Sequence, residues 1–256
     1  MGLKSSMTLK IMESQKDKIA VWDADFIPFY VCYNKKDEPI KSLEECKALC
    51  DSMIDTINIS TRCDYYTGYL TVGKCFRYEV NPSYKANRKY GETPPFIAEI
   101  KDHLKTNHNF LFDTRYEADD LVLSFKAQNP QYECVIISPD KDVLNLHEGG
   151  YNPRLNQFKY TSKEDAEKFF WGSMIIGDRV DGIPGIPGMG KKAVEKLFDR
   201  PNITSYMAIV QEEYCKVFGE YEGIKEFTRN YLSLKLVDNV KLEEVKLNKI
   251  DKLLCE

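Results

Sequence analysis

Short apolar runs alternate with amphipathic stretches of helical spacing along most of the chain. Four runs predict buried strands, at residues 18–22, 65–72, 110–112 and 134–137. Apolar residues recur at helical spacing over residues 42–60, and further helices are predicted to begin near Pro95, Glu117 and Ser162. Because strands and helices alternate, the pattern predicts an α/β fold with a mostly parallel central sheet flanked by helices.

The second half of the chain changes character after about residue 150. A hairpin is predicted over residues 151–160, turning around Asn152-Pro153 or Leu155-Asn156, and Ser162 with Asp165 caps the helix that follows. Residues 202–256 are predicted to form helices without chemical motifs. We therefore expect a flexible tail over residues 1–17, an α/β core over 18–161 and a helical region over 162–256.

Composition narrows the class of protein. The 256 residues can bury a substantial core, no apolar run approaches the length of a membrane span, and the first eighteen residues lack the apolar centre of a signal peptide. The eight cysteines contain no Cys-x-x-Cys pair, which favours a reduced, cytoplasmic protein. The formal charge of −4 argues mildly against nucleic-acid binding, but less so if many acids are metal ligands.

Acidic residues gather at three predicted element ends. Asp23 and Asp25 follow the first strand, where residues two apart point to one side in an extended chain. The start of a helix and the end of a strand each add acids, which are Glu117, Asp119, Asp120, Asp140 and Asp142. An acidic helix start is often only a cap, and an acidic loop is often only solvated. Together these clusters instead predict a site for Mg²⁺ or Mn²⁺, since such carboxylates repel one another unless cations neutralise them.

A basic segment follows the second strand. On a helix Lys85, Arg88 and Lys89 would share one face, which could bind phosphates while Tyr84 stacks beside it. A charged helix face is also commonly just solvated, so this pattern is weak evidence when taken by itself.

Residues 177–193 are rich in glycine and proline, which predicts a shaped loop between helices. Gly185, Gly190 and Lys191 fit the spacing of a P-loop, but Lys192 stands where that motif needs Ser or Thr, and no strand precedes it. The pattern around Gly188 also fits a helix-hairpin-helix, whose backbone amides bind a nucleic-acid phosphate without reading sequence. A purely structural loop remains the third interpretation.

The order of these motifs resembles the 5′-nuclease (flap endonuclease) family. Five features carry the resemblance over roughly residues 18–198: Asp23, the segment 84–88, the Glu-Ala-Asp-Asp motif at 117–120, the Ser-Pro-Asp-Lys-Asp motif at 138–142, and the Gly-Asp-Arg-Val-Asp motif at 177–181 followed by the hairpin. The family includes the 5′-nuclease domains of bacterial DNA polymerases and the stand-alone bacteriophage exonucleases and ribonucleases H. The small size and the lack of a polymerase are similar to the bacteriophage branch.

The resemblance implies a PIN-like fold and a two-metal phosphodiesterase. It implies that the first metal is served by Asp23, Glu117, Asp119 and Asp140, that Asp120 lies between the sites, and that the second metal is held by Asp142, Asp178 and Asp181. Lys85 and Arg88 would neutralise the scissile phosphate at the base of an arch over residues 82–95. The helix-hairpin-helix would bind duplex DNA, and its loop would hold K⁺ as a further ion. Its residues are Gly185, Gly188, Gly190, Lys191 and Lys192.

The sequence departs from the family pattern in two places. Leu70 or Thr71 stands where the family has another acid, and Asp25 is our hypothesis for its substitute. The arch is also short, because few residues separate Lys89 from Pro94.

Three functions are compatible with these motifs. The leading prediction is a Mg²⁺-dependent 5′ to 3′ nuclease that acts on DNA ends, flaps or RNA:DNA hybrids during replication or repair. We expect a monomer in the host cytoplasm, without membrane contact and with a replication protein as a further partner. The alternatives are a nucleic-acid-binding protein that lacks activity because of the missing acid, and a PIN-type ribonuclease, which has no evident use for the hairpin.

Overall fold

The computed structural model describes residues 16–33, 40–88, 93–146, 150–200, 203, 205–242 and 244–250. Most of the predicted N-terminal tail, the predicted phosphate ligand Lys89 and part of the predicted arch therefore lie outside the described residues.

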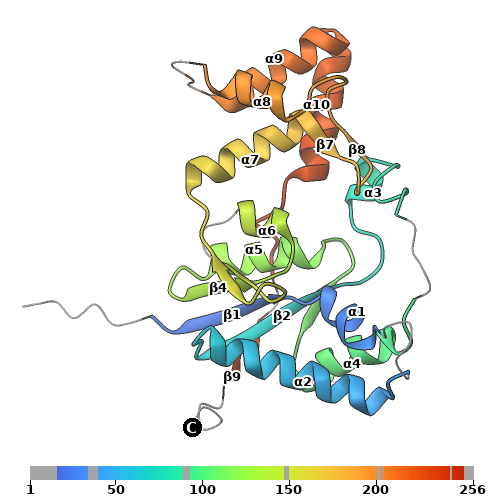
Figure 1. Ribbon diagram of the computed structural model, residues 1–256, viewed down its shortest axis with the longest axis vertical. Coiled ribbons are helices and arrows are strands. Elements are labelled where there is room, and N and C mark those ends of the chain that lie inside the picture. Colours follow the sequence, from blue (N-terminus) through green and yellow to red (C-terminus); the bar gives the residue numbers. More distant parts are fainter. Residues whose placement is uncertain are drawn as a thin grey trace, which may run out of the picture.

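A seven-stranded mixed sheet forms the centre of the molecule (Figure 1). β1 (Lys18–Asp23) lies in the middle, parallel to β2 (Tyr65–Thr71) on one side and to β4 (Glu133–Ile137) on the other. β3 (Leu111–Asp113) extends the sheet beside β2, and β5 (Gly150–Asn152) extends it beside β4, both in parallel. β6 (Gln157–Lys159) closes the predicted hairpin antiparallel to β5. The prediction of an α/β fold with flanking helices is confirmed.

Side chains of β1 alternate between two separate apolar cores, as expected for a strand buried on both faces. Ala20 and Trp22 pack with α1 (Phe26–Cys32), α2 (Leu43–Ser60) and α4 (Ile97–Asn107) on one face. Ile19 and Val21 pack with α5 (Ala118–Gln128) on the other, near α6 (Lys141–Leu146). The sheet is therefore covered on both sides, and its open ends remain for a site.

A separate group of helices lies beyond α5 and α6, at the top of Figure 1. It consists of α7 (Lys163–Ile176), α8 (Lys191–Phe198), α9 (Tyr206–Phe218) and α10 (Glu220–Leu234), which share their own apolar core. Between α7 and α8 the chain forms a small antiparallel pair, β7 (Gly177–Asp178) and β8 (Ile183–Pro184). The short α3 (Arg77–Val80) contacts α10 and so joins this group to the core.

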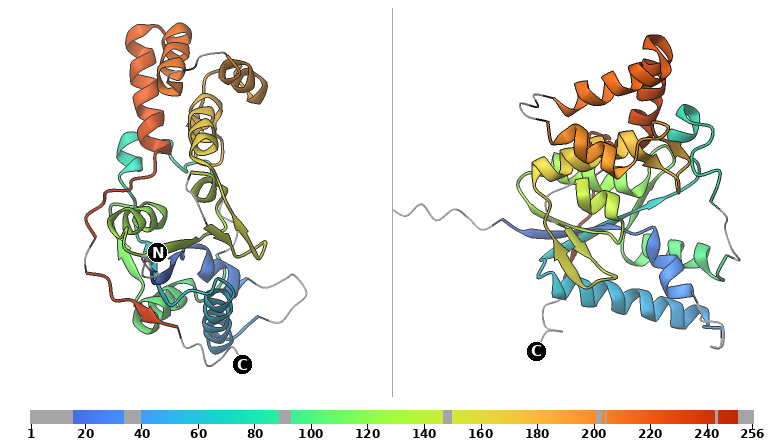
Figure 2. Two further views of the ribbon diagram at one scale, coloured as in Figure 1. Left: turned by 90° about the vertical axis from the view of Figure 1, so that its left-hand side faces the viewer. Right: turned by 45° about the horizontal axis from the view of Figure 1, so that its top comes forward.

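The segment after α10 differs from prediction. The residues after α10 that the structure describes, 235–242 and 244–250, form no helix and run back along the α/β core, as Figure 2 shows. The backbone amide of Val240 donates to Ser124 Oγ (3.0 Å), and Gln128 Nε2 donates to the carbonyl of Val240 (2.7 Å). The segment ends in β9 (Asn248–Lys249), which pairs antiparallel with β2. The predicted helices over 202–256 are therefore wrong for this stretch.

The basic segment also differs from prediction, because residues 82–87 form turns and not a helix. Lys85 adopts a positive φ of 54°. Among the described residues no helix is long and apolar enough to cross a membrane.

Candidate functional site

The loops after β1 and β4 meet at the carboxyl end of the sheet, where open α/β sheets place their ligands. Asp23 ends β1, and its Oδ2 accepts a hydrogen bond from Ser138 Oγ (2.8 Å). The same Ser138 oxygen accepts from the backbone amide of Asp140 (3.0 Å), and Asp140 Oδ1 accepts from the amide of Asp142 (2.7 Å). A single serine, which the sequence analysis left without a role, thus fixes two predicted metal ligands relative to each other.

Two adjoining cavities lie at this edge and collect the acidic residues. One, of about 680 Å³, is lined by Asp23, Asp25, Glu117 and Asp140. The other, of about 420 Å³, is lined by Asp119, Asp140, Asp142, Asp178 and Asp181. Lys85, Arg88, Asp140 and Lys141 line both. Seven of the eight predicted metal ligands are therefore gathered here, and Asp140 stands where the cavities meet.

The carboxylates in these cavities are short of positive charge. Burial, Asp25 and Asp140 raise the pKa of Asp23 to about 7, and burial with Asp140 raises the pKa of Asp142 to about 6. The pKa of Asp119 is also raised, by burial and by the charges of Asp120 and Glu117. Oxygen donors that repel one another in this way fit hard divalent cations such as Mg²⁺ or Mn²⁺.

Two predicted ligands are held by protein cations. Glu117 is an ion-pair partner of Lys85, and it also accepts hydrogen bonds from Tyr84 Oη (2.7 Å) and Arg77 Nη1 (3.1 Å). Burial alone would raise the pKa of Glu117, but Lys85 and Arg77 bring it below its usual value. Arg88 forms the corresponding ion pair with Asp181. The predicted basic pair therefore lies in the site, next to the acids.

Asp120 does not fit its predicted place between two metals. It is fully buried, and each of its carboxylate oxygens accepts from Arg77 at 2.6 Å. The backbone amides of Val237 (2.8 Å) and Glu117 (3.1 Å) donate to the same carboxylate. Four hydrogen bonds leave no oxygen lone pair directed at the cavities, so Asp120 is a structural partner of Arg77.

Arg77 is the functional neighbour that the sequence analysis missed. It is 1% exposed and donates from Nε to the carbonyl of Ser233 (3.1 Å) and from Nη2 to that of Lys235 (3.0 Å). It thereby links α5 to the end of α10. Its partners lie up to 158 residues away in sequence, so no local pattern indicates them.

The predicted stacking role of Tyr84 is wrong. Tyr84 is only 3% exposed, and its ring packs edge-on against Tyr78 with the centroids 5.3 Å apart. A base cannot reach a ring in this position. The hydroxyl of Tyr84 instead orients Glu117.

Asp25 lies beside the position of the missing acid. Its Oδ1 accepts from the backbone amide of Thr71 (2.7 Å), and both residues line the larger cavity with Asp23. Thr71 Oγ1 in turn accepts from the amide of Ala118, at the start of α5 (2.9 Å). The carboxylate of Asp25 therefore lies next to Thr71, one of the two positions where the family pattern has an acid.

The glycine-rich loop follows helix α7, and the strand directly before Gly185 is the two-residue β8, which pairs with β7 in a separate small sheet; the P-loop interpretation would instead require a strand of the central sheet. A Cβ on Gly185 would lie 2.2 Å from the carbonyl oxygen of Ile175, so this glycine allows close packing against α7. Nothing lies within 4 Å of a Cβ at Gly188 or Gly190, and Lys191 and Lys192 are exposed at the start of α8. The outer part of the loop is thus accessible to a ligand.

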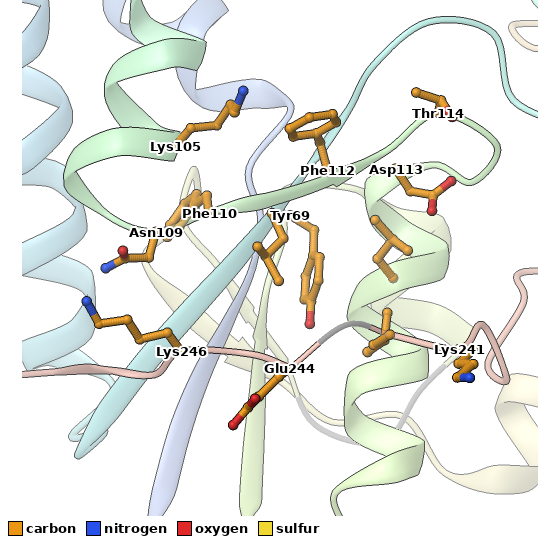
Figure 3. Close-up of a pocket in the computed structure, with 13 residues that line it drawn as sticks. Tyr69, Lys105, Asn109, Phe110, Phe112, Asp113, Thr114, Lys241, Glu244 and Lys246 are labelled. Atoms are coloured by element: carbon orange, nitrogen blue, oxygen red, sulfur yellow. The ribbon is translucent and has the colours of Figure 1, made fainter.

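A further cavity, of about 540 Å³, lies at the β3 edge of the sheet, away from the acidic site (Figure 3). Its lining mixes Lys105, Lys241 and Lys246 with Asp113 and Glu244 around Tyr69 and Phe112. None of the predicted site residues lines it, so it is separate from the two acidic cavities.

Comparison with known proteins identifies a family. Residues 26–169 match the model of the 5′–3′ exonuclease N-terminal resolvase-like domain. DNA polymerase I of Borreliella burgdorferi is 32% identical over 194 residues, which cover 66% of this chain and 21% of the polymerase. The chain therefore spans about one fifth of the length of that polymerase. Flap endonuclease Xni of Shewanella pealeana is 30% identical over 197 residues, covering 66% of this chain and 74% of Xni.

The fold also resembles a solved structure. The bacteriophage T5 flap endonuclease, crystallised as a pseudo-enzyme-product complex with DNA and metal ions, superposes with a TM-score of 0.61. The match covers 85% of this chain and 89% of that one at 19% identity.

Proposed function

This chain belongs to the 5′–3′ exonuclease family, and from that premise we propose that it is a divalent-metal-dependent nuclease that hydrolyses phosphodiester bonds near the 5′ ends of DNA. The observation that carries the proposal is the pair of adjoining cavities that share Asp140, collect seven of the eight predicted metal ligands and contain Lys85 and Arg88. Acids for cations and bases for a phosphate are thereby brought together at one sheet edge.

The residues present fit two Mg²⁺ or Mn²⁺ ions. Asp23, Glu117 and Asp140 would hold the first ion, with Asp119 reaching it directly or through water, and Asp142, Asp178 and Asp181 would hold the second. Two such ions, when bound, activate water and stabilise the leaving oxygen of a phosphodiester. The raised pKa values of Asp23 and Asp142 support this assignment, because these carboxylates need a cation to be charged together at neutral pH.

Lys85 and Arg88 would bind the scissile phosphate from the opposite side. Both are now ion-paired, with Glu117 and Asp181. A phosphate that attracts the two cations would free the two acids for metal, so substrate and metal would bind cooperatively. The charge of the phosphate is then neutralised as it develops in the transition state.

The loop between α7 and α8 would hold the duplex. Gly188 and Gly190 leave the backbone accessible, no described side chain caps the start of α8, and Lys191 and Lys192 add charge. The proposal includes K⁺ as an ion within this loop and an RNA:DNA hybrid as a second substrate. It also includes a monomer in the cytoplasm, that of the host if a bacteriophage encodes the protein, with a replication protein as partner. A role in replication or repair is supported by the names of the relatives, a DNA polymerase and a flap endonuclease.

The test is cleavage of a 5′-labelled flap duplex with Mg²⁺ or with chelator, in parallel with an RNA:DNA hybrid. Short 5′ products that require metal are expected for the DNA substrate. Asp178→Asn should abolish cleavage and leave DNA binding intact. Asp199→Asn, an exposed acid of the same helical region, should change neither and serves as the matched control.

The same assay separates the alternatives. Binding without cleavage by the unmodified protein would identify an inactive nucleic-acid-binding protein and make the missing acid at Thr71 its cause. Cleavage of single-stranded RNA alone would identify a PIN-type ribonuclease. The position of Asp25 beside Thr71 favours the active enzyme over the first alternative.

A further inference from the structure

Three side chains with metal-binding atoms converge on the sheet face covered by α2 and α4, outside the acidic cavities. Asp51 comes from the middle of α2, His103 from α4, and His108 is the residue that follows α4. Their ligand atoms all lie within 4.8 Å of one another. Two of the three histidines in the chain are gathered here.

Both imidazoles point to a single oxygen. His103 Nε2 is 2.6 Å and His108 Nε2 is 2.8 Å from the same Asp51 Oδ1, and the two rings are inclined at 71°. A metal centre requires donor atoms gathered within a few ångströms, as these three atoms are, and an ion would replace both hydrogen bonds to Oδ1. Tetrahedral Zn²⁺ with bonds of about 2 Å spaces its ligand atoms about 3.3 Å apart, so each imidazole nitrogen would retreat from Oδ1 by less than about 1 Å and the two nitrogens would adjust their separation by at most about 1.5 Å.

The surroundings support two further requirements of a metal site. His108 Nδ1 lies 2.9 Å from Tyr66 Oη, which orients the ring from behind, as partners of metal-bound histidines commonly do. Both imidazole side chains are 9% exposed, while that of Asp51 is 45% exposed. The ligands are therefore held by packing on one side and open to an entering ion and water on the other.

We propose that Asp51, His103 and His108 form a further metal site of the Zn²⁺ class, separate from the acidic centre and its two ions. Two imidazole nitrogens and one carboxylate oxygen are donors that suit Zn²⁺, whereas Mg²⁺ prefers oxygen alone. Water would complete the coordination. The ion would fasten α4 to α2, and α4 carries Lys101, which donates to the carbonyl of Thr71 (3.0 Å) and lines the larger acidic cavity. The site would thus stabilise one wall of the active centre.

The test uses Co²⁺ as the probe, titrated into the chelator-stripped full chain in excess Mg²⁺. Excess Mg²⁺ competes for the oxygen-only acidic centre, where six-coordinate Co²⁺ would absorb weakly, whereas Co²⁺ in a four-coordinate site of the Zn²⁺ class absorbs strongly in the visible range. We expect one equivalent of Co²⁺, displaced by Zn²⁺. Asp51→Asn and His103→Gln should each weaken Co²⁺ binding at least about tenfold. Asp102→Asn, an exposed neighbour on α4, should leave it unchanged.

A second variant and a second readout keep the two centres distinct. Asp178→Asn should retain the Co²⁺ signal, because it alters only the acidic centre. Zn²⁺ in excess Mg²⁺ should also raise the melting temperature of the unmodified protein but not that of Asp51→Asn. The proposal fails if Co²⁺ is not retained against Mg²⁺, or if Asp178→Asn removes the signal while Asp51→Asn keeps it; either result would leave a hydrogen-bond cluster that joins two helices.

Discussion

Asp119 and Asp120 are neighbours in the first turn of α5, yet the fold treats them in opposite ways. Asp120 is fully buried and receives four hydrogen bonds, two of them from Arg77. Asp119 lines a cavity, and burial together with nearby carboxylates raises its pKa. The protein supplies Asp120 with a cation, while Asp119 accepts one backbone amide and faces a cavity.

This difference explains how the fold can remain stable although several carboxylates lie close together. Uncompensated carboxylates destabilise a fold, and here the helix start that carries them is fixed by a neutralised pair beside them. The Arg77–Asp120 pair also ties in the end of α10 and the segment that follows it. We therefore expect one acid of the motif to govern stability and the other to govern activity.

The largest expected effect comes from breaking the buried pair. Arg77→Met should lower the free energy of unfolding by about 3–5 kcal/mol, because it leaves the charge of Asp120 buried without its cation, bound by two backbone amides alone. Chemical denaturation measures this. Arg115→Met is the matched control, since its side chain is 62% exposed and lies 3.8 Å from Glu79; it should cost less than about 1 kcal/mol. Equal losses for the two variants would contradict the structural role of Arg77.

The opposite half of the comparison concerns activity. Asp119→Asn should reduce metal-dependent cleavage at least about 100-fold, since a metal contributes several kcal/mol to the transition state of a phosphodiester. Its free energy of unfolding without metal should not fall, because the substitution removes a repelling charge. Flap cleavage and denaturation in chelator measure the two quantities. A strong loss of stability would show that Asp119 shares the structural role of Asp120.

The sequence could predict the features that depend on local patterns, but not those that depend on distant contacts. The strands were predicted because apolar runs bounded by polar loops are local signals, and the acids were placed together because parallel strands end at one edge. The roles of Tyr84 and Asp120 were wrong, because burial depends on distant partners. Arg77 contacts residues more than 150 positions away, and the segment after α10 is held by hydrogen bonds to α5 that no local pattern indicates.

The same limit applies to the loop and the histidines. The sequence does not distinguish Gly185 from Gly188 and Gly190. In the structure Gly185 packs against Ile175, whereas Gly188 and Gly190 face open space. Asp51 lies more than 50 residues before both His103 and His108, so their convergence is a property of the helix packing.

The unneutralised acids predict a pH dependence of intermediate size. The raised pKa values of Asp23 (about 7) and Asp142 (about 6) mean that their stabilising, protonated forms are lost as the pH rises from about 4 through 7. Mg²⁺ competes with these protons, so the rise in melting temperature on adding Mg²⁺ should be larger at pH 8 than at pH 6. The lowered pKa of Glu117 acts below this window.

Thermal melts with and without Mg²⁺ between pH 5.5 and 8.5 measure this difference. A double variant, Asp23→Asn with Asp142→Asn, should melt with little dependence on Mg²⁺ or on pH in that range. If Mg²⁺ raises the melting temperature of the unmodified protein equally at both ends of the range, Mg²⁺ does not compete with protons for Asp23 and Asp142.

The smallest expected effect concerns Asp25, which lies between the two kinds of acid. Like Asp120, it accepts a hydrogen bond from a backbone amide, that of Thr71. Like Asp119, it lies near other carboxylates, and it raises the pKa of Asp23. If it substitutes for the acid missing at Thr71, Asp25→Asn should raise the Mg²⁺ concentration for half-maximal cleavage about tenfold, as changes beside metal ligands commonly do. Because the asparagine amide oxygen can still accept from Thr71, the fold should be unchanged. A Mg²⁺ titration of flap cleavage measures the shift, and an unshifted titration curve would assign Asp25 to holding the β1–β2 edge alone.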